Sequence, residues 1–406
     1  MHIHTVKEGE SVFAIAKQYA VSPMSIIENN GLENPDRLTV GEELLVLTPS
    51  RTYVARNGDT VSSIARRFGV RKSELYANNP ALMGKEGVYD GQLLALKYGD
   101  ARLGMGASNG YFFKGCSEAA LCRALPYLTY VTVGAVIAHD GRFSSIFNHK
   151  DIAQKIRAEG KIPMLRIYDE NSTDFYDNRE ALCPYYDTII NYAKKCGFAG
   201  ITLSVPKEEV NVHSYESFII ELRRRLIGCD LILFTEAVVG REHGYADYAD
   251  GCILSYDKMA LSDIPNFENG EKAAYTSYSE VSESSKTFMD IPSFALTSDG
   301  YVDYKEAVRA AAKLGVHIER DDTTGVCSYS YNDKRGEPHT VRFESLKNVK
   351  AKLDLLGELG FMGISFDIMR CPIEHLMMYN ALFSGICYAS VFANGESLHS
   401  SDAPLS

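Results

Sequence analysis

Short apolar runs alternate with amphipathic segments along the chain from Leu103 onward. The runs have the length of buried strands, and the segments between them have the apolar spacing of surface helices. Strand–helix units in series build a parallel sheet, and eight such units close into a barrel. Eight strands are expected, at residues 110–113, 130–134, 163–168, 200–204, 231–234, 251–255, 290–296 and 363–366. The predicted fold class is therefore α/β, with a (β/α)8 TIM barrel over residues 103–392 and a C-terminal tail at 393–406.

An alternating pattern interrupts the barrel after its seventh expected strand. Residues 316–343 alternate between apolar and polar positions, and Asp333-Lys334-Arg335-Gly336 has the composition of a tight turn. A period of two is typical of strands that bury one face. The pattern predicts a small inserted α+β subdomain at about residues 300–345.

The first hundred residues contain an internal repeat. At an offset of about 49 residues, 4–16 aligns with 53–65, 26–30 with 75–79, and 38–46 with 88–96. Each unit reads as strand, helix, helix and strand, and Ser11 and Thr60 are placed to cap the first helix of their units. Two βααβ modules are therefore predicted, at residues 2–48 and 51–97.

The two units resemble LysM modules, through Gly58-Asp59-Thr60-Val61 and through the Asn-Asn pair that ends the second helix of each unit. LysM modules bind N-acetylglucosamine polymers in a shallow groove, so the resemblance implies one groove in each unit. The groove walls would be Gly9, Glu10, Ser11, Val12, Leu38, Thr39 and Val40 in the first unit, and Gly58, Asp59, Thr60, Val61, Val88, Tyr89 and Asp90 in the second. The simpler alternative is that the Gly-Asp-Thr run only caps a helix. Two weak modules on one chain would raise avidity through their effective concentration.

The barrel segment resembles glycoside hydrolase family 18, in the spore-associated branch whose members carry LysM modules. The resemblance rests on Asn109-Gly110-Tyr111, Leu125-Pro126-Tyr127-Leu128-Thr129-Tyr130, Ser255-Tyr256-Asp257, Val341-Arg342-Phe343-Glu344-Ser345 and Gly363-Ile364-Ser365-Phe366-Asp367. It implies a cleft lined by Tyr111, Tyr256, Asp257 and Asp367. Such a cleft would lie at the C-terminal ends of the strands, where barrel enzymes place their chemistry.

Residues 197–209 correspond to the catalytic strand of that family. The family motif is Asp-Gly-x-Asp/Asn-x-Asp-x-Glu, and its last Glu protonates the leaving oxygen while the sugar's own N-acetyl oxygen attacks. The corresponding residues here are Ala199, Thr202, Ser204 and Pro206. A proline has no proton to give, and general acid catalysis contributes on the order of 10² to 10⁴ in rate. Since no catalytic residue remains in the motif, we expect a barrel that is not an enzyme.

The chain also contains no tryptophan, whereas the family stacks the bound sugar on a Trp at the end of the last strand. Asp367 stands at that position, and Arg342 replaces another family Trp. Carboxylates at other strand ends could supply a relocated acid, and the stand-in candidates are Glu208, Glu236 and Asp257, with Asp169, Glu170 and Glu209 as further acids in this region. The alternative for these side chains is a solvated or salt-bridged place in loops.

The composition is that of an ordinary globular protein, with 45% hydrophobic and 23% charged residues. The net charge of −11 and the lack of a basic tract argue against nucleic acid as a partner. No apolar stretch reaches 18 residues, so no membrane span is expected. The nine cysteines lack the spacing of metal ligands and are expected to be reduced. No metal site and no cofactor are predicted.

The intact repeats and the altered motif together lead to a functional hypothesis. It is a protein that binds peptidoglycan or another N-acetylglucosamine polymer and carries an inactive glycosidase-like barrel. The alternative is an active glycoside hydrolase that cleaves N-acetylglucosaminyl bonds in cortex peptidoglycan or a chitin-like polymer with a relocated acid. The first residues show no charged segment before an apolar one, so synthesis in the cytoplasm without a signal peptide is expected. The resemblance implies a mother-cell protein of the spore cortex or coat surface, with spore coat proteins as further partners.

Overall fold

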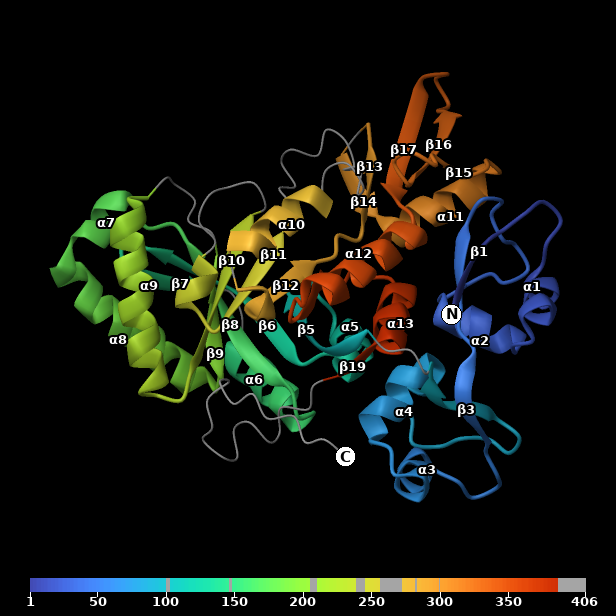
Figure 1. Cartoon of the computed structure of the whole chain (residues 1–406), viewed down its shortest axis with the longest axis horizontal. Helices are drawn as coiled ribbons and strands as arrows, with labels where there is room; N and C mark the ends of the chain where they lie inside the picture. Colours follow the sequence, from blue (N-terminus) through green and yellow to red (C-terminus); the bar gives the residue numbers. More distant parts are fainter. Residues whose placement is uncertain are drawn as a thin grey trace.

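The computed structural model describes residues 1–99, 103–145, 148–204, 210–238, 245–255, 272–281, 283–298 and 300–385. Eight parallel strands close a barrel in this part of the chain. Figure 1 shows the barrel strands in the middle of the molecule. β5 pairs with both β6 and β18, which closes the ring. The barrel strands are β5 (Gly104–Phe112), β6 (Tyr130–His139), β8 (Ile162–Asp169), β9 (Gly200–Leu203), β10 (Ile232–Val238), β11 (Gly251–Ser255), β12 (Thr287–Asp290) and β18 (Gly363–Asp367). The predicted α/β barrel is confirmed.

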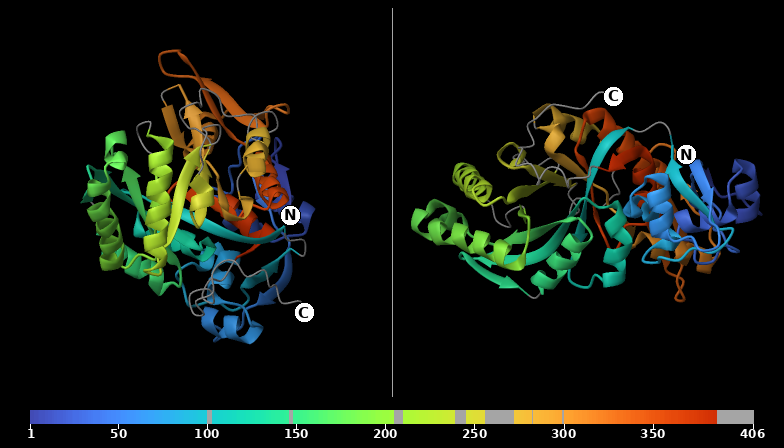
Figure 2. Two further views of the ribbon diagram at one scale, coloured as in Figure 1. Left: turned by 60° about the vertical axis from the view of Figure 1, so that its left-hand side comes forward. Right: turned by 90° about the horizontal axis from the view of Figure 1, so that it is seen from below.

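Helices cover the outside of the barrel (Figure 2). They are α5 (Glu118–Ala124), α6 (His149–Ala158), α7 (Thr173–Asp177), α8 (Arg179–Cys196), α9 (Val212–Ile227), α10 (Lys272–Val281), α12 (Leu346–Leu359) and α13 (Ile373–Leu382). The longest of these, α8, begins where the Asn178 side chain accepts two backbone N–H groups and ends at Gly197, with φ of +80°. Its apolar face is buried, and each buried side chain such as Ile189 contributes about 1.5–3 kcal/mol.

The barrel lumen is packed with side chains. Its lower part holds aromatic rings, and the Tyr130 and Phe234 ring centroids lie 4.9 Å apart. Polar side chains fill the next layer, where Asn109 donates to Ser365 Oγ at 3.1 Å and accepts from Thr132 Oγ1 at 2.8 Å. A filled lumen of this kind is a core, so a ligand can reach the barrel only at the ends of the strands.

A five-stranded antiparallel sheet is inserted between β12 and α12, in the strand order β14-β13-β17-β16-β15. Its elements are β13 (Phe294–Thr297), β14 (Gly300–Asp303), α11 (Tyr304–Leu314), β15 (Glu319–Arg320), β16 (Val326–Asn332) and β17 (Pro338–Glu344). α11 buries Ala307 and Ala311 in the small core of this insert. The insert agrees with the predicted α+β subdomain.

The prediction of the seventh barrel strand at residues 290–296 is wrong. β12 ends at Asp290, and Phe294 begins β13 in the inserted sheet. Pro292 lies between the two strands, and a proline cannot donate a hydrogen bond to a central ladder. The single apolar run therefore contains the end of one strand and most of another, in two different sheets.

Each N-terminal repeat folds as two antiparallel strands and two helices. The first repeat consists of β1 (His2–Thr5), α1 (Val12–Tyr19), α2 (Pro23–Asn29) and β2 (Glu43–Val46), and the second of β3 (Pro49–Val54), α3 (Val61–Phe68), α4 (Lys72–Asn78) and β4 (Leu93–Tyr98). Ser11 Oγ accepts the Ala14 N–H at 3.3 Å, and Thr60 forms a capping box with Ser63. The expected caps of α1 and α3 are confirmed.

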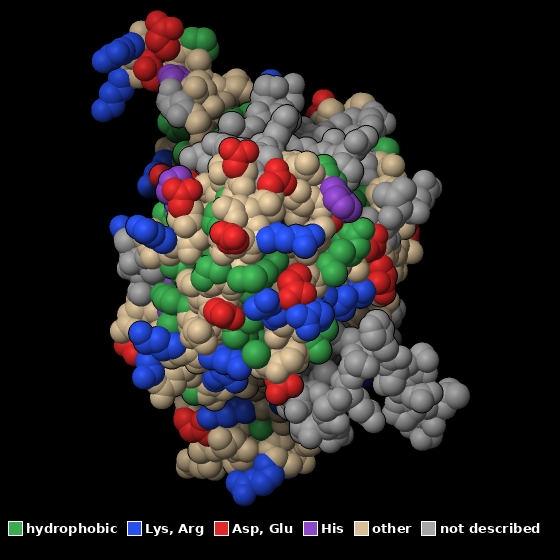
Figure 3. All heavy atoms as spheres, turned by 90° about the vertical axis from the view of Figure 1, so that its left-hand side faces the viewer, with side chains coloured by type: hydrophobic (Ala, Val, Ile, Leu, Met, Phe, Trp, Pro, Cys, Tyr) green, Lys and Arg blue, Asp and Glu red, His purple; other side chains and the backbone are tan. Residues whose placement is uncertain are grey.

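The two repeats lie together at one end of the molecule, opposite α7, α8 and α9 (Figures 1 and 2). The second repeat contacts the barrel through Tyr127, whose hydroxyl donates to the Ala77 carbonyl at 2.9 Å. The first repeat contacts the insert through Lys305 Nζ, which donates to the Asn30 carbonyl at 2.7 Å. On the face that carries α7 to α9, acidic and basic side chains are interspersed (Figure 3). Among the described residues, no helix is both long enough and apolar enough to cross a membrane.

Candidate functional site

A buried ion pair lies in the upper part of the lumen, toward the C-terminal ends of the strands. Arg166 on β8 and Glu236 on β10 form two parallel hydrogen bonds, from Nε to Oε1 at 2.6 Å and from Nη2 to Oε2 at 2.7 Å. The Tyr111 hydroxyl on β5 donates a third hydrogen bond to Glu236 Oε1 at 2.9 Å. Charge-assisted bonds in this fork geometry are strong and directional. Glu236 is therefore held in one position as an acceptor.

Aromatic rings surround the Arg166 guanidinium. Its carbon lies 5.8, 5.6 and 5.6 Å from the ring centroids of Tyr111, Phe113 and Tyr168. Burial opposes the charge on Arg166, but attraction and hydrogen bonding by Glu236 raise the pKa of Arg166 above its usual value. Burial, followed by the nearby charge of Glu236, raises the pKa of Tyr111 well above its usual value. Tyr111 is therefore a neutral hydrogen-bond donor.

The residues that replace the family motif are distributed along β9. Thr202 is buried in the lumen, with its Oγ1 3.4 Å from Thr132 Oγ1. Ser204 lies at the C-terminal end, where its Oγ accepts the Asp169 N–H at 2.9 Å. Ala199 lies at the opposite end of the strand and belongs to the lower core of the lumen. Thr202 and Ser204 are thus neutral, hydrogen-bonded lumen residues, and Ala199 is remote from the C-terminal face.

The other positions of interest follow β9 and β11 and lie outside the described residues. They are Pro206, Glu208, Glu209, Tyr256 and Asp257. β10, which carries Glu236, pairs with both β9 and β11. The strands that precede these positions in the sequence, β9 and β11, are therefore the two neighbours of the strand that carries Glu236.

Asp367 ends β18 opposite Tyr111 in the strand ladder. Its Oδ1 accepts the Met369 N–H and its carbonyl accepts the Cys371 N–H, both at 2.9 Å. Asp367 therefore shapes the turn that follows β18. Arg342, the other residue at a family tryptophan position, is exposed on β17 of the insert.

Asp169 is a buried carboxylate whose partners lie on the outer helices. Tyr176 on α7 and Tyr215 on α9 both donate to Oδ2, and Asn171 donates its backbone N–H to Oδ1 at 3.1 Å. Burial raises the pKa of Asp169. The Asp169 side chain fixes α7 and α9 to the end of β8. Its partners differ from those of the Arg166–Glu236 pair. The neighbouring Glu170 is half-buried, and its backbone N–H donates to the Ala138 carbonyl at 2.9 Å.

A carboxylate holds the first wall of each predicted groove. In the second repeat, Asp59 Oδ2 accepts the Arg56 N–H at 2.8 Å. In the first repeat, Glu10 Oε2 accepts the Lys7 N–H at 2.8 Å and lies 2.8 Å from His4 Nε2. Asp59 and Glu10 therefore shape their loops from within.

The first wall of the second groove is bonded to the residues directly before its second wall. The Val61 N–H donates to the Glu86 carbonyl at 2.9 Å, and Thr60 forms an isolated bridge with Gly87. Gly58, Tyr89 and Asp90 are exposed at this site, and Val88 is half-buried. In the first repeat Gly9 and Ser11 are exposed, Leu38 and Val40 are half-buried, and Val12 and Thr39 are buried. The two grooves thus differ in their second walls.

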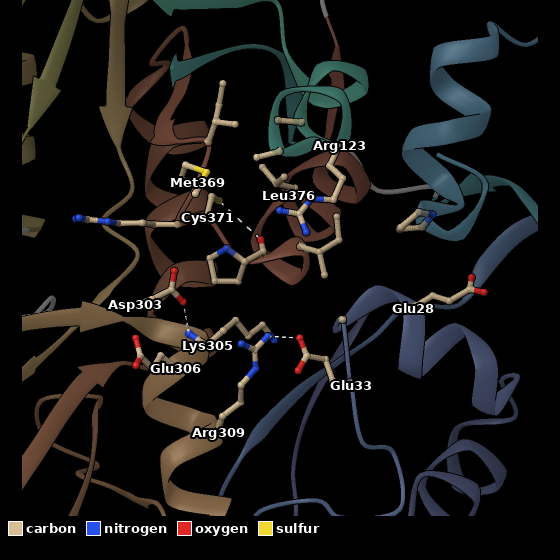
Figure 4. Close-up of a pocket in the computed structure, with 18 of the residues that line it drawn as sticks. Glu28, Glu33, Arg123, Asp303, Lys305, Glu306, Arg309, Met369, Cys371 and Leu376 are labelled. Atoms are coloured by element: carbon tan, nitrogen blue, oxygen red, sulfur yellow. Dashed lines mark hydrogen bonds and ion pairs between the residues drawn. The ribbon is translucent and has the colours of Figure 1, made fainter. Parts of the chain in front are cut away.

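A cavity of about 750 Å³, which the sequence did not reveal, lies between the two repeats, α11 and the turn after β18 (Figure 4). Charged side chains of both signs line it, including Glu28, Glu33, Arg123, Glu306, Arg309 and Arg370. Arg309 and Glu33 pair across it at 2.5 Å. The lining residues come from segments far apart in the chain, so no local pattern could have indicated the cavity.

The described cysteines carry free thiols, and Cys387 lies outside the described residues. Burial raises the pKa of several of these thiols, to about 11 for Cys252. Within the described ranges, no group of three or more His, Cys, Asp or Glu side chains is arranged to hold a metal ion.

A family model for the LysM domain matches residues 4–46 and 53–95. The chain therefore contains two LysM domains, which are the first and second repeats. A curated relative is similar along nearly the whole chain. This "Cortical fragment-lytic enzyme" of Bacillus anthracis is 26% identical over 419 aligned residues, which cover 92% of this chain and 96% of the relative.

Solved structures show the same fold. The crystal structure of the Bacillus cereus spore cortex-lytic enzyme SleL has a TM-score of 0.74 at 23% identity, and the match covers 95% of this chain and 99% of SleL. A chitinase from Chromobacterium violaceum ATCC 12472 has a TM-score of 0.58 at 17% identity, with 69% of this chain and 99% of the chitinase covered. The shorter match agrees with a chitinase-like barrel that follows the two repeats.

These comparisons contradict the expectation that the chain is not an enzyme. Relatives that match both LysM domains and the barrel are named as lytic enzymes. The expectation gave too much weight to one strand, because the loss of a carboxylate at Pro206 does not remove acids from its neighbourhood. Glu208 and Glu209 follow two and three residues later in the same segment.

Proposed function

We propose that this protein is a glycoside hydrolase that binds peptidoglycan through its LysM domains and cleaves N-acetylglucosaminyl bonds in spore cortex fragments. The observation that carries the proposal is the similarity to a cortical fragment-lytic enzyme along 92% of the chain. That match includes both LysM domains and the barrel in one alignment. One chain would thus hold the glycan and cut it.

Hydrolysis needs a proton donor at the C-terminal end of the lumen. In the substrate-assisted reaction the N-acetyl oxygen attacks the anomeric carbon, and an acid protonates the leaving oxygen. We assign the acid to residues 205–209, with Glu208 as the first candidate and Glu209 as the second. This segment follows Ser204, and β9 is the strand next to the one that carries Glu236.

Glu236 has a different role in this proposal. It accepts hydrogen bonds from Arg166 and Tyr111, so its oxygens are already engaged by donors. A carboxylate held in this way suits charge stabilisation and orientation of the reacting sugar better than proton donation. The Arg166–Glu236 pair and the aromatic rings around Arg166 would form the floor of the subsite in which the bond is cut.

Release of reducing ends from purified cortex fragments tests the proposal. We expect release by the wild-type chain and a loss on the order of 10² to 10⁴ in rate for Glu208→Gln or Glu209→Gln, whichever removes the acid. Glu180→Gln, an exposed substitution on α8, serves as the matched control and should keep full activity. No release by the wild-type chain would contradict the proposal. Activity that survives both Glu208→Gln and Glu209→Gln but disappears in a folded Glu236→Gln would assign the acid to Glu236 on β10.

The proposed substrate implies a place of action on the spore. We infer that the protein is made in the mother cell and acts at the spore cortex or coat surface, with coat proteins as further partners. A fluorescent fusion should surround the forespore during sporulation. A signal restricted to vegetative cells would contradict this location.

A further inference from the structure

The second walls of the two grooves have opposite exposure. Thr39 in the first repeat is 5% exposed, whereas Tyr89 at the matching position of the second repeat is 65% exposed. The same contrast continues along the following strand. The Glu43 side chain is 2% exposed, and its counterpart Leu93 is 52% exposed. The repeats are alike in fold but differ in what surrounds them.

The inserted sheet covers the second wall of the first repeat. The Ile318 N–H donates to the Val40 carbonyl at 2.9 Å, so this wall uses its backbone for a contact within the protein. Gly41 lies directly against the Ile318 carbonyl, with no room for a Cβ atom. The matching Gly91 has no atom within 4 Å of the same position. A glycan that reached the Val40 backbone would have to displace the insert.

Further contacts fix the first repeat in this place. Arg309 on α11 pairs with Glu33 at 2.5 Å, as Figure 4 shows. Lys347 at the start of α12 donates its backbone N–H to Glu43 Oε2 at 3.1 Å, and its Nζ lies 3.4 Å from Oε1. These bonds join the buried Glu43 side chain of the first repeat to the start of α12. The first repeat is thus held in one position against the insert and the barrel.

The second repeat docks through its other side. α4 provides the contacts with the barrel, from the Ala77 carbonyl to the Tyr127 hydroxyl and from Asn78 Oδ1 to Asn380 Nδ2 at 2.8 Å. The groove loops are held by each other, since the Val61 N–H donates to the Glu86 carbonyl. Glu86 Oε1 also accepts the Ser62 N–H at 2.9 Å. This groove is therefore preformed and open to solvent at Tyr89.

We propose that the two LysM domains have divided roles: the second binds the N-acetylglucosamine-containing glycan, and the first is a fixed link that joins the binding domain to the insert and barrel. The inference rests on the proposed glycan-binding function and adds which domain performs it. The exposed Tyr89 ring supplies a flat apolar surface for the face of a sugar. The fixed link sets one orientation of the bound strand relative to the barrel, which a flexible tether would not do.

Binding of an N-acetylglucosamine pentamer to the full chain tests this inference by calorimetry, with product analysis to verify that the pentamer stays intact. We expect one pentamer bound to the LysM domains of each chain, apart from any pentamer held in the barrel. Its affinity should fall about tenfold or more for Tyr89→Ala and should not change for the matched Thr39→Ala. Hydrogen exchange should show protection by the pentamer at residues 86–91 and none at 37–41. Melting temperatures identify any variant that fails to fold, and the exchange data on the wild-type chain do not depend on the variants.

Two kinds of result would overturn the inference. Equal losses in both variants, or protection at residues 37–41, would show that the first repeat binds glycan, and the proposed binding function would still stand. No binding of the wild-type chain to the pentamer or to cortex glycan would overturn both proposals together.

Discussion

The Arg166–Glu236 pair sets the electrostatics of the upper lumen. Its two side chains are 18% and 12% exposed, so the charges are largely removed from water. Such a pair adds little net stability, but removal of one partner leaves the other charge buried without compensation. The aromatic rings around Arg166 stabilise the cation further. Arg166 is therefore the charged partner that compensates the burial of Glu236.

Arg166→Met should lower the free energy of unfolding by about 3 kcal/mol, because among the described residues Tyr111 alone then donates a hydrogen bond to Glu236. Urea denaturation at neutral pH measures this loss. The matched control is Arg224→Met on α9, which breaks an exposed pair with Glu221 and should cost less than about 1 kcal/mol. Equal losses in the two variants would contradict the burial argument.

His149 should make the barrel sensitive to acid. Burial lowers the pKa of His149 to about 4 from its ordinary value of 6.5, and its Nδ1 lies 2.9 Å from the Tyr192 hydroxyl. Because the unfolded chain takes up the proton first, the stabilising contribution is complete above about pH 6.5 and is lost as the pH falls toward 4. The total is on the order of 2–3 kcal/mol. Unfolding free energies of wild type and His149→Gln across this range test the effect, and identical pH slopes would count against it.

Residue types at the site could be predicted, but their partners could not. The sequence identifies Glu236, Asp169 and Asp367 as acids at strand ends. Asp169 and Asp367 end their strands, and Glu236 lies two residues before the end of β10. The sequence does not show that Arg166 binds Glu236 or that tyrosines on α7 and α9 bind Asp169. Nor does it show that Asp367 shapes a turn. Arg166 and Glu236 are 70 residues apart in the sequence, and only closure of the barrel brings them together.

At the scale of elements, the sequence predicts a helix or strand boundary correctly where a few neighbouring residues determine it. A helix cap depends on a few neighbouring residues, so Ser11 and Thr60 could be identified from their side chains and spacing. The boundary between β12 and β13 depends on which sheet each strand joins. That choice is made by distant partners, β18 for β12 and β17 for β13. For this reason the apolar run at residues 290–296 could not be divided correctly.

Thr60→Ala should destabilise the second repeat by about 1 kcal/mol, because α3 loses its capping box. The backbone amides of α3 should then exchange hydrogen faster than in the wild-type chain. Thr52→Ala on β3 removes an exposed threonine of the same domain and serves as the control. If both variants exchanged alike, the cap would not be a determinant of this helix.

At the scale of the whole molecule, the repeats, insert and barrel are joined by side chains that each contact two or three parts. Lys305 on α11 donates to the Asn30 carbonyl of the first repeat and pairs with Glu374 of α13 at 2.5 Å. The sequence predicted the parts as successive units, and nothing in their local patterns indicates these joints. Contacts between units arise from the final arrangement, so they are visible only in three dimensions.

Lys305→Met should therefore lower the free energy of unfolding by an amount that depends on pH, because Lys305 joins the first repeat, the insert and α13. Burial raises the pKa of Glu374 and Lys305 opposes that rise, so the variant should hold Glu374 with a still higher pKa. A carboxyl whose pKa is higher in the folded state loses stability as the pH rises through that value. The penalty of the substitution should thus be larger at pH 8 than at pH 5, as measured by urea denaturation. Lys313→Met, an exposed change on the same helix, should show no such difference. A penalty for Lys305→Met that is the same at both pH values would mean that the ion pair with Glu374 does not hold the joint.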